Sequence, residues 1–153
     1  MPLQVAVFGG GSFATAMGAA LARQKHDLKV HMLLRAQEQC EHINDSHENS
    51  RYLPGVTLPE NLSASTDIES VLADAQYVIH ALPVQASRAF LASIKDILPV
   101  TTPVICVSKG IEKSTGYLMS EVFPSALGRK HPCVFLSGPS FAQEVPRPTL
   151  SPA

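Results

Sequence analysis

The sequence passes from a short β-rich run directly into a helical pattern through three consecutive glycines. Leu3–Phe8 (LQVAVF) predicts a buried strand, and apolar residues at helical spacing predict a helix over Ser12–Gln24. The connection at residues 9–14 (GGGSFA) fits the form G-x-G-x-x-A. Such a string is weak evidence alone, but directly after a strand and at the start of a helix it indicates a loop that holds a dinucleotide pyrophosphate.

Each small residue of this loop has a physical role in that interpretation. Gly9 permits the tight turn, Gly11 lets the backbone approach the diphosphate, and Ala14 keeps the helix close to the strand. The free N–H groups at the helix start would face the anion, and the helix dipole would add about 0.3–1 kcal/mol. The alternative is a glycine-rich turn that binds no ligand.

β-rich runs and helical stretches alternate along the rest of the chain, as in a parallel sheet covered on both faces. Six strands with intervening helices predict an α/β fold of the Rossmann type, a doubly wound, mainly parallel sheet with helices on both faces. Thr66 or Asp67 can cap the third helix. Beyond the first strand and helix, we expect strands at 28–34, 62–65, 77–82, 103–107 and 133–137, and helices at 36–46, 67–74, 85–97 and 117–127.

Composition narrows the class of protein. The net charge of −1 gives no basic field for nucleic acid, and no apolar run approaches the roughly 20 residues of a membrane span. Cys40, Cys106 and Cys133 form no Cys-x-x-Cys pair, and the last two sit in apolar runs, which favours buried, reduced thiols inside a cell. Because the glycine loop begins at Gly9, we expect no removable signal or transit peptide and a cytoplasmic location.

Arg35 bears on which dinucleotide is bound. In NAD-binding versions of this fold an acidic residue near the end of the second strand receives the ribose hydroxyl. Here the sequence at that place is LLRA, with no acid before Glu38. A guanidinium there can pair with the 2′-phosphate of NADP, so NADP(H) is favoured and NAD(H) stays possible. The alternative is a solvated arginine at a strand end.

Further strings lie where such a fold would place its ligands. The two most specific are SKGIE at 108–112 and SGPSFAQE at 137–144. The others are NxxHxN at 44–49, YLPG at 52–55, LPxNL at 58–62 and PxQAxR at 83–88. In this order behind the glycine loop, they closely resemble the N-terminal domain of NAD(P)-dependent glycerol-3-phosphate dehydrogenase, the bacterial and plastid type, over about residues 5–145.

The resemblance implies a Rossmann-type domain followed by a helical substrate domain. It implies reversible hydride transfer between a nicotinamide cofactor and dihydroxyacetone phosphate, giving sn-glycerol 3-phosphate for phospholipid synthesis. It also implies that Ser12 and Phe13 touch the cofactor, although Phe13 equally suits core packing.

Lys109 is the expected catalytic contribution of this segment. It follows the fifth expected strand, at the edge where open α/β sheets bind ligands, and its ammonium could stabilise a forming alkoxide. The resemblance implies that Lys109 contacts both cofactor and substrate, that Gly138 and Ser140 contact the substrate, and that the Ala142 backbone contacts the cofactor. The alternatives are a surface lysine and a Gly-Pro turn that merely ends a strand.

Other polar residues carry weaker signals. His42 and His47 lack a third ligand nearby, so no metal site is expected. For His47 and Tyr52 a polar loop folded over the cofactor edge is the favoured interpretation. Three acids are expected to be helix caps or solvated charges: Asp67, Asp74 and Glu112.

The family pattern is lost near the end of this sequence. We expect a dinucleotide-binding domain over 1–145 and a tail or truncation point at 146–153, with the helical substrate domain and its main acid/base lysine missing. Such a chain should bind dinucleotide but transfer hydride poorly. Its uncovered surface could favour a homodimer. Two other interpretations stay open: another two-domain reductase, such as a ketopantoate enzyme, and a non-catalytic dinucleotide-binding module that senses redox state.

Overall fold

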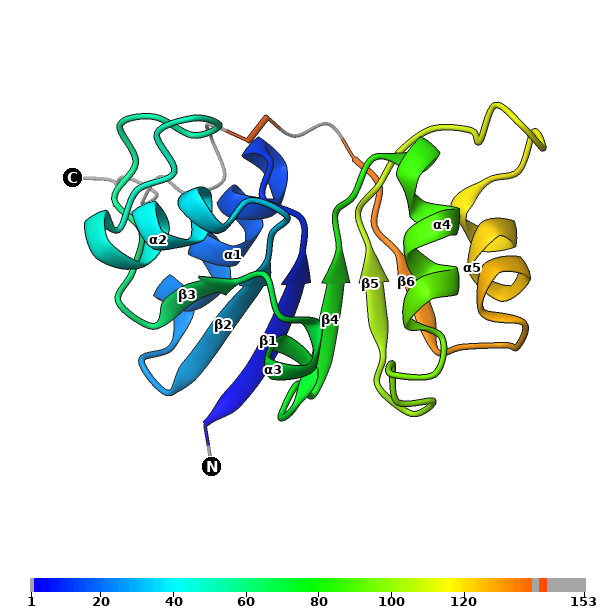
Figure 1. Cartoon of the computed structure of the whole chain (residues 1–153), viewed down its shortest axis with the longest axis horizontal. Coiled ribbons are helices and arrows are strands. Elements are labelled where there is room, and N and C mark those ends of the chain that lie inside the picture. The colour runs from blue at the N-terminus through cyan, green and yellow to red at the C-terminus, as the bar shows by residue number, and fades with distance from the viewer. Residues whose placement is uncertain (1, 139–140, 143–153) are drawn as a thin grey trace.

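The computed structural model describes residues 2–138 and 141–142. Its strands form one sheet in the order β3-β2-β1-β4-β5-β6, and every neighbouring pair is parallel (Figure 1). This is the strand order of a Rossmann-type doubly wound sheet, which confirms the predicted fold class. The strands are β1 (Leu3–Phe8), β2 (Leu28–Leu33), β3 (Leu62–Ser65), β4 (Tyr77–His80), β5 (Val104–Cys106) and β6 (Cys133–Phe135).

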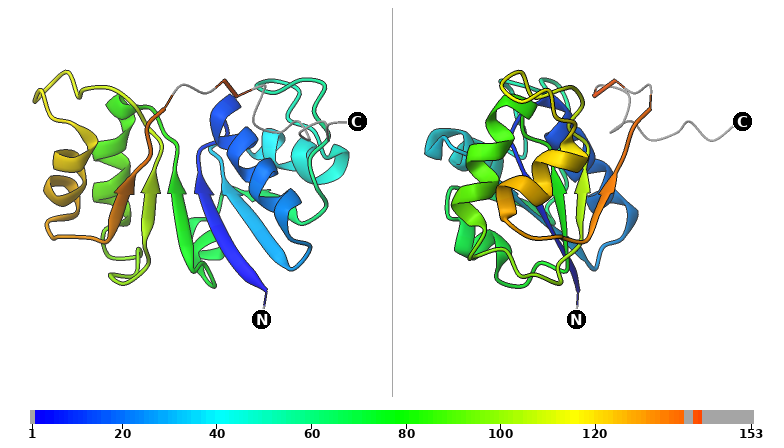
Figure 2. Two further views of the ribbon diagram at one scale, coloured as in Figure 1. Left: turned by 180° about the vertical axis from the view of Figure 1, so that it is seen from behind. Right: turned by 90° about the vertical axis from the view of Figure 1, so that its right-hand side faces the viewer.

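Helices cover both faces of the sheet. Figure 2 shows α1 on one side of the strands, with α4 and α5 on the other. Buried residues of α1 and α2 share one apolar cluster, and buried residues of α3, α4 and α5 share the second. The helices are α1 (Ser12–Gln24), α2 (Gln37–Ser46), α3 (Ile68–Leu72), α4 (Val84–Ile94) and α5 (Met119–Leu127).

The first strand shows how these two clusters are built. Val5 and Val7 belong to the cluster under α1 and α2, whereas Ala6 and Phe8 belong to the cluster under α3, α4 and α5. All four side chains are at most 5% exposed. Because this part of a parallel strand lies between two helical layers and has no solvent face, residues 5–8 are continuously apolar instead of alternating.

Several elements are shorter than predicted. The strand expected at 77–82 ends at His80, since Pro83 caps α4 and the residues between them line the loop edge of the sheet. The helix expected from 117 begins at Met119, because the N–H of Leu118 donates to the Glu121 carboxylate at 3.0 Å. The predicted cap at Asp67 is confirmed: its side chain accepts a hydrogen bond from the N–H of Glu69.

The three thiols are free. Cys40 and Cys106 are buried and Cys133 is partly buried. Burial raises the pKa of the Cys106 thiol, and it raises the pKa of Cys133 to about 12. Both thiols are therefore held protonated in the apolar runs, as the sequence predicted for small buried hydrophobes.

Candidate functional site

A cleft of about 1340 Å³ opens at the carboxyl ends of the central strands. Its walls come from the β1–α1 loop, the end of β2, the segment after β4 and the segment after β5. Among the described residues that line it there are three cations and no carboxylate, so it favours an anionic ligand. The cations are Arg35, Arg51 and Lys109.

The glycine loop forms the floor of this cleft, and its first glycine is required by the backbone. Gly9 has φ 121°, and a Cβ there would lie 2.9 Å from the carbonyl oxygen of Ala81. The N–H of Gly9 donates to the carbonyl of Leu33 at 3.0 Å. The strand-to-helix turn therefore needs glycine for both conformation and space, as predicted.

The other two glycines differ in what surrounds them. A Cβ at Gly10 would lie 2.5 Å from Cγ of Leu34, so close packing against this residue, just after β2, requires glycine there too. The motif had left this position free, because the contact comes from a residue far away in sequence. A Cβ at Gly11 would meet nothing within 4 Å, since this residue faces the open cleft.

The start of α1 places the remaining motif residues. Ala14 is 1% exposed and packs in the cluster under α1, which keeps the helix against the sheet as predicted. Phe13 is partly buried against the same cluster, which confirms its role in core packing, and it also lines the cleft. The Ser12 hydroxyl donates to the carbonyl of Tyr52 at 2.6 Å.

That hydrogen bond brings a distant segment to the cleft. Tyr52 and Arg51 both line it, and the Arg51 guanidinium lies 5.2 Å from the centre of the Tyr52 ring. His47 instead ends α2: it has φ 50°, and its N–H donates to the carbonyl of Ile43 at 3.0 Å. The polar loop thus reaches the cleft through Tyr52, whereas His47 serves the helix end.

Lys109 lies where the sequence placed it, beyond β5. Its Nζ donates to the carbonyl oxygen of Gly138, after β6, at 2.6 Å, and lies 5.8 Å from the centre of the Phe13 ring. One cation therefore joins the ends of two strands to the start of α1 at the mouth of the cleft. Ala142 is half-buried and is not among the described residues that line the cleft; Ser140 lies outside the described residues.

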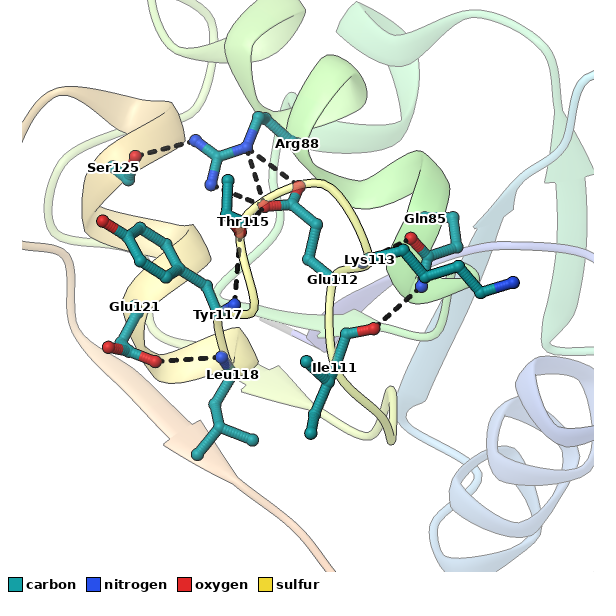
Figure 3. A network of polar contacts seen from close by, with 10 residues as sticks. All are labelled: Gln85, Arg88, Ile111, Glu112, Lys113, Thr115, Tyr117, Leu118, Glu121 and Ser125. Carbon is teal, nitrogen blue, oxygen red and sulfur yellow. Dashed lines mark hydrogen bonds and ion pairs between the residues drawn. The ribbon is translucent and has the colours of Figure 1, made fainter.

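The loop that carries Lys109 is anchored to α4 by an ion pair (Figure 3). Nε of Arg88 donates to Oε1 of Glu112 at 2.9 Å and its Nη2 donates to Oε2 at 2.8 Å, while Nη1 donates to the Ser125 hydroxyl at 2.7 Å. Gln85 provides a second anchor: its Nε2 donates to the Ile111 carbonyl at 2.9 Å, and its Oε1 accepts from the N–H of Lys113 at 3.0 Å.

This geometry corrects the prediction that Glu112 is a cap or a solvated charge. Glu112 is only 3% exposed, and its carboxylate also accepts a hydrogen bond from the Thr115 hydroxyl. The hydrogen bonds from Arg88, and then that from Thr115, lower the pKa of Glu112. The same pairing raises the pKa of Arg88.

His80 is a buried polar residue that sequence reasoning missed. His80 is the last residue of β4 and is 0% exposed. Its Nε2 lies 2.9 Å from the hydroxyl oxygen of Ser87. That hydroxyl donates its proton to the Pro83 carbonyl at 3.0 Å, so Nε2 of His80 must donate to Ser87. Nδ1 has no hydrogen-bond partner, and burial lowers the pKa of His80 to about 4.

No group of three or more His, Cys, Asp or Glu side chains in the described part of the chain could hold a metal ion. No helix there is long and apolar enough to cross a membrane.

An all-parallel sheet in this order, with a glycine turn leading into α1 beneath an anion-favouring cleft, defines a dinucleotide-binding domain of the Rossmann type. The chain also matches the family model described as NAD-dependent glycerol-3-phosphate dehydrogenase N-terminus over residues 4–151. It therefore belongs to this family, which confirms the resemblance and excludes a ketopantoate-type reductase.

Similar proteins agree with this assignment. The chain is 48% identical over 143 residues to the chloroplastic glycerol-3-phosphate dehydrogenase [NAD(+)] 2 of Arabidopsis thaliana, covering 93% of this chain and 34% of that protein. It is 41% identical to the glycerol-3-phosphate dehydrogenase [NAD(P)+] of Leptospira biflexa, covering 94% and 43%. The solved glycerol-3-phosphate dehydrogenase of Coxiella burnetii superposes with a TM-score of 0.85 at 29% identity, covering 94% and 43%. The chain thus spans less than half the length of these relatives.

Proposed function

We propose that the cleft binds the diphosphate of a nicotinamide dinucleotide against Gly9, Gly11 and the start of α1. The open space above Gly11 carries this proposal, since a Cβ there would meet no atom within 4 Å. A helix N-terminus with its free N–H groups favours an anion. The cleft's cations and its volume of about 1340 Å³ suit the same ligand.

Arg35 sets the preference among dinucleotides in this proposal. It is exposed and lines the cleft just beyond β2, where the adenosine ribose of a Rossmann ligand lies. Its guanidinium can bind the 2′-phosphate of NADP(H), and no carboxylate among the described lining residues would oppose that phosphate. NADP(H) is therefore favoured over NAD(H).

The activity we infer is that of a glycerol-3-phosphate dehydrogenase, the name that its relatives carry. The nicotinamide would supply or accept the hydride for dihydroxyacetone phosphate and sn-glycerol 3-phosphate. The ammonium of Lys109 would stabilise the negative charge that forms on the substrate oxygen. Gly138, which already holds that ammonium through its carbonyl, and Ser140 would bind the polyol phosphate.

The remaining roles also stay proposals. Ser12, Phe13, Ala14 and the Ala142 backbone would contact the cofactor, and the product would enter phospholipid synthesis in the cytoplasm. The relatives extend well beyond the aligned part, so we infer that this segment supplies the dinucleotide site and that full turnover needs residues those relatives have elsewhere.

Two measurements on this chain test the proposal. Titration with NADPH and NADH, followed by dinucleotide fluorescence, should show saturable binding of both with NADPH the tighter ligand. NADPH oxidation with dihydroxyacetone phosphate should then be far slower than that of the Leptospira biflexa relative assayed alongside. Absence of binding refutes the dinucleotide site, and turnover equal to the relative's refutes the inferred need for further residues.

A further inference from the structure

Asn49 is far from the glycine loop in sequence but is hydrogen-bonded to it. Its Nδ2 donates to the carbonyl oxygen of Gly10 at 3.0 Å and to the hydroxyl of Thr15 at 2.8 Å. Asn49 is 1% exposed and Thr15 0% exposed, so water has little access to these contacts. Asn49 itself is not among the described residues that line the cleft, although the Gly10 that it holds is.

The carbonyls of Gly10 and Gly11 both accept hydrogen bonds from side chains. The Gly10 carbonyl accepts a second hydrogen bond from Nε2 of Gln39 at 2.8 Å, and the same nitrogen lies 3.3 Å from Oδ1 of Asn49. The next carbonyl, that of Gly11, accepts from the Thr15 hydroxyl at 2.8 Å. Two consecutive peptide groups therefore have their oxygens fixed toward α1 and α2.

The planar trans peptide bond also fixes the direction of the loop's N–H groups. In such a peptide the N–H points opposite to the C=O. Because Asn49 and Thr15 hold the carbonyls of Gly10 and Gly11, the N–H groups of Gly11 and Ser12 point away from these two side chains, and both Gly11 and Ser12 line the cleft. An anion in the cleft meets donors that are already oriented.

We propose that Asn49 is a positioning residue for dinucleotide binding: it fixes the Gly10–Gly11 peptide so that the loop's N–H groups face the diphosphate. This inference rests on the proposed function, since it concerns the same ligand. Asn49 acts through the loop and does not touch the ligand. Its contribution is to remove the peptide reorientation that binding would otherwise require.

The segment around Asn49 is itself held in place. The Asn49 carbonyl accepts from the N–H of Leu53 at 2.8 Å, and Leu53 is 1% exposed. The Ser12 hydroxyl binds the Tyr52 carbonyl at 2.6 Å, so the segment contacts the glycine loop at two points. Asn49 is therefore placed by packing that does not depend on the ligand.

Asn49→Ala and a matched control test the proposal. Asn61 is the control because its Nδ2 also donates to backbone carbonyls, those of Ala22 at 2.8 Å and Leu28 at 2.6 Å, but at the opposite end of α1. Binding of NADPH, NADH and inorganic pyrophosphate is measured by titration at a temperature where circular dichroism shows each variant folded. Gln39→Ala, which removes one donor to Gly10 from a half-buried site, is the second variant should Asn49→Ala fail to fold.

The expected pattern separates positioning from general destabilisation. Asn49→Ala should weaken NADPH and NADH by the same factor of about ten, and weaken pyrophosphate as well. Gln39→Ala should act in the same direction with a smaller factor. Asn61→Ala should lower the melting temperature and leave all three dissociation constants within about twofold.

The contrary outcomes are distinct. If Asn49→Ala and Gln39→Ala bind NADPH as the unsubstituted chain does, the positioning role is wrong and the proposed function stands. If Asn61→Ala weakens binding as much as Asn49→Ala, the loss reflects destabilisation, and the inference is wrong. If the unsubstituted chain binds neither dinucleotide, the proposed function fails and this inference fails with it.

Discussion

The ammonium of Lys109 donates to the carbonyl oxygen of Gly138 at 2.6 Å, which joins the loop after β5 to the loop after β6. The two residues come from the two most specific strings of the sequence, and the fold brings them together at the mouth of one cleft. This contact holds a single cation beside the space where the proposed nicotinamide and substrate would meet.

Removing the Lys109 ammonium should slow hydride transfer. In an enzyme of the relatives' length that contains this segment, Lys109→Ala should lower kcat by about 100-fold or more, since charge on the substrate oxygen loses its stabilising partner. Lys113→Ala, on the same loop, should leave kcat near normal. Steady-state kinetics with dihydroxyacetone phosphate measure both, and near-normal turnover of the Lys109 variant would contradict the assigned role.

Arg35 should discriminate between the two dinucleotides. Arg35→Ala should raise the dissociation constant of NADPH by about tenfold or more and that of NADH by less than about twofold, because only NADPH offers a 2′-phosphate. Arg51→Ala serves as the matched control, since this second arginine also lines the cleft and should not discriminate. Equal weakening of both ligands by Arg35→Ala would remove the proposed NADP preference.

The Arg88–Glu112 pair should make stability depend on pH in the acid range. Because the pKa of Glu112 is lowered in the folded chain, its stabilisation is present above the ordinary carboxyl pKa of 4.5 and is lost as pH falls further. Urea unfolding at a series of pH values should show a smaller acid loss in Glu112→Gln than in the unsubstituted chain. The exposed Glu60→Gln is the control. An unchanged pH profile in Glu112→Gln would show that the pair does not act in this way.

His80 should make the folding stability depend on pH in a higher range than Glu112 does. The pKa of His80 is lowered from 6.5 to about 4 in the folded chain. Between these two values, His80 is protonated in the unfolded chain but neutral in the folded chain. Stability should therefore fall as pH drops from 6.5 toward 4, by about 2 kcal/mol between pH 7 and pH 5. His80→Gln should flatten this slope, and the exposed His26→Gln should not. Equal slopes in all three chains would refute the prediction.

The parts of the site that sequence reasoning found are local in the chain. The turn formed by Gly9 and the packing of Ala14 against the sheet were predicted correctly, because both are set by neighbouring residues in the chain. The parallel, doubly wound sheet followed from the alternation of strands and helices, since parallel strands require crossover connections. Lys109 was placed correctly because it directly follows a strand whose carboxyl end meets the others.

The parts that it missed depend on contacts between distant residues. Gly10 is required by Leu34, and the Gly10 carbonyl is held by Asn49, which lies 39 residues away. Glu112 is buried because Arg88, 24 residues earlier, meets it from α4. Spacing within one segment carries no information about such partners. Gly10 was therefore a free motif position, Asn49 was one member of the NxxHxN string with no partner named, and Glu112 was expected to be a cap or a solvated charge.

Gly11→Val tests whether the dinucleotide diphosphate lies over the glycine loop. Gly11 has φ −77° and ψ −176°, which any residue adopts, and a Cβ there meets nothing within 4 Å, so the fold should lose at most about 1 kcal/mol of stability. The new side chain would occupy the space assigned to the diphosphate, and titration should show NADPH binding weakened by at least about tenfold while circular dichroism stays unchanged. If a folded Gly11→Val chain binds NADPH as tightly as the unsubstituted chain, the diphosphate does not lie over Gly11.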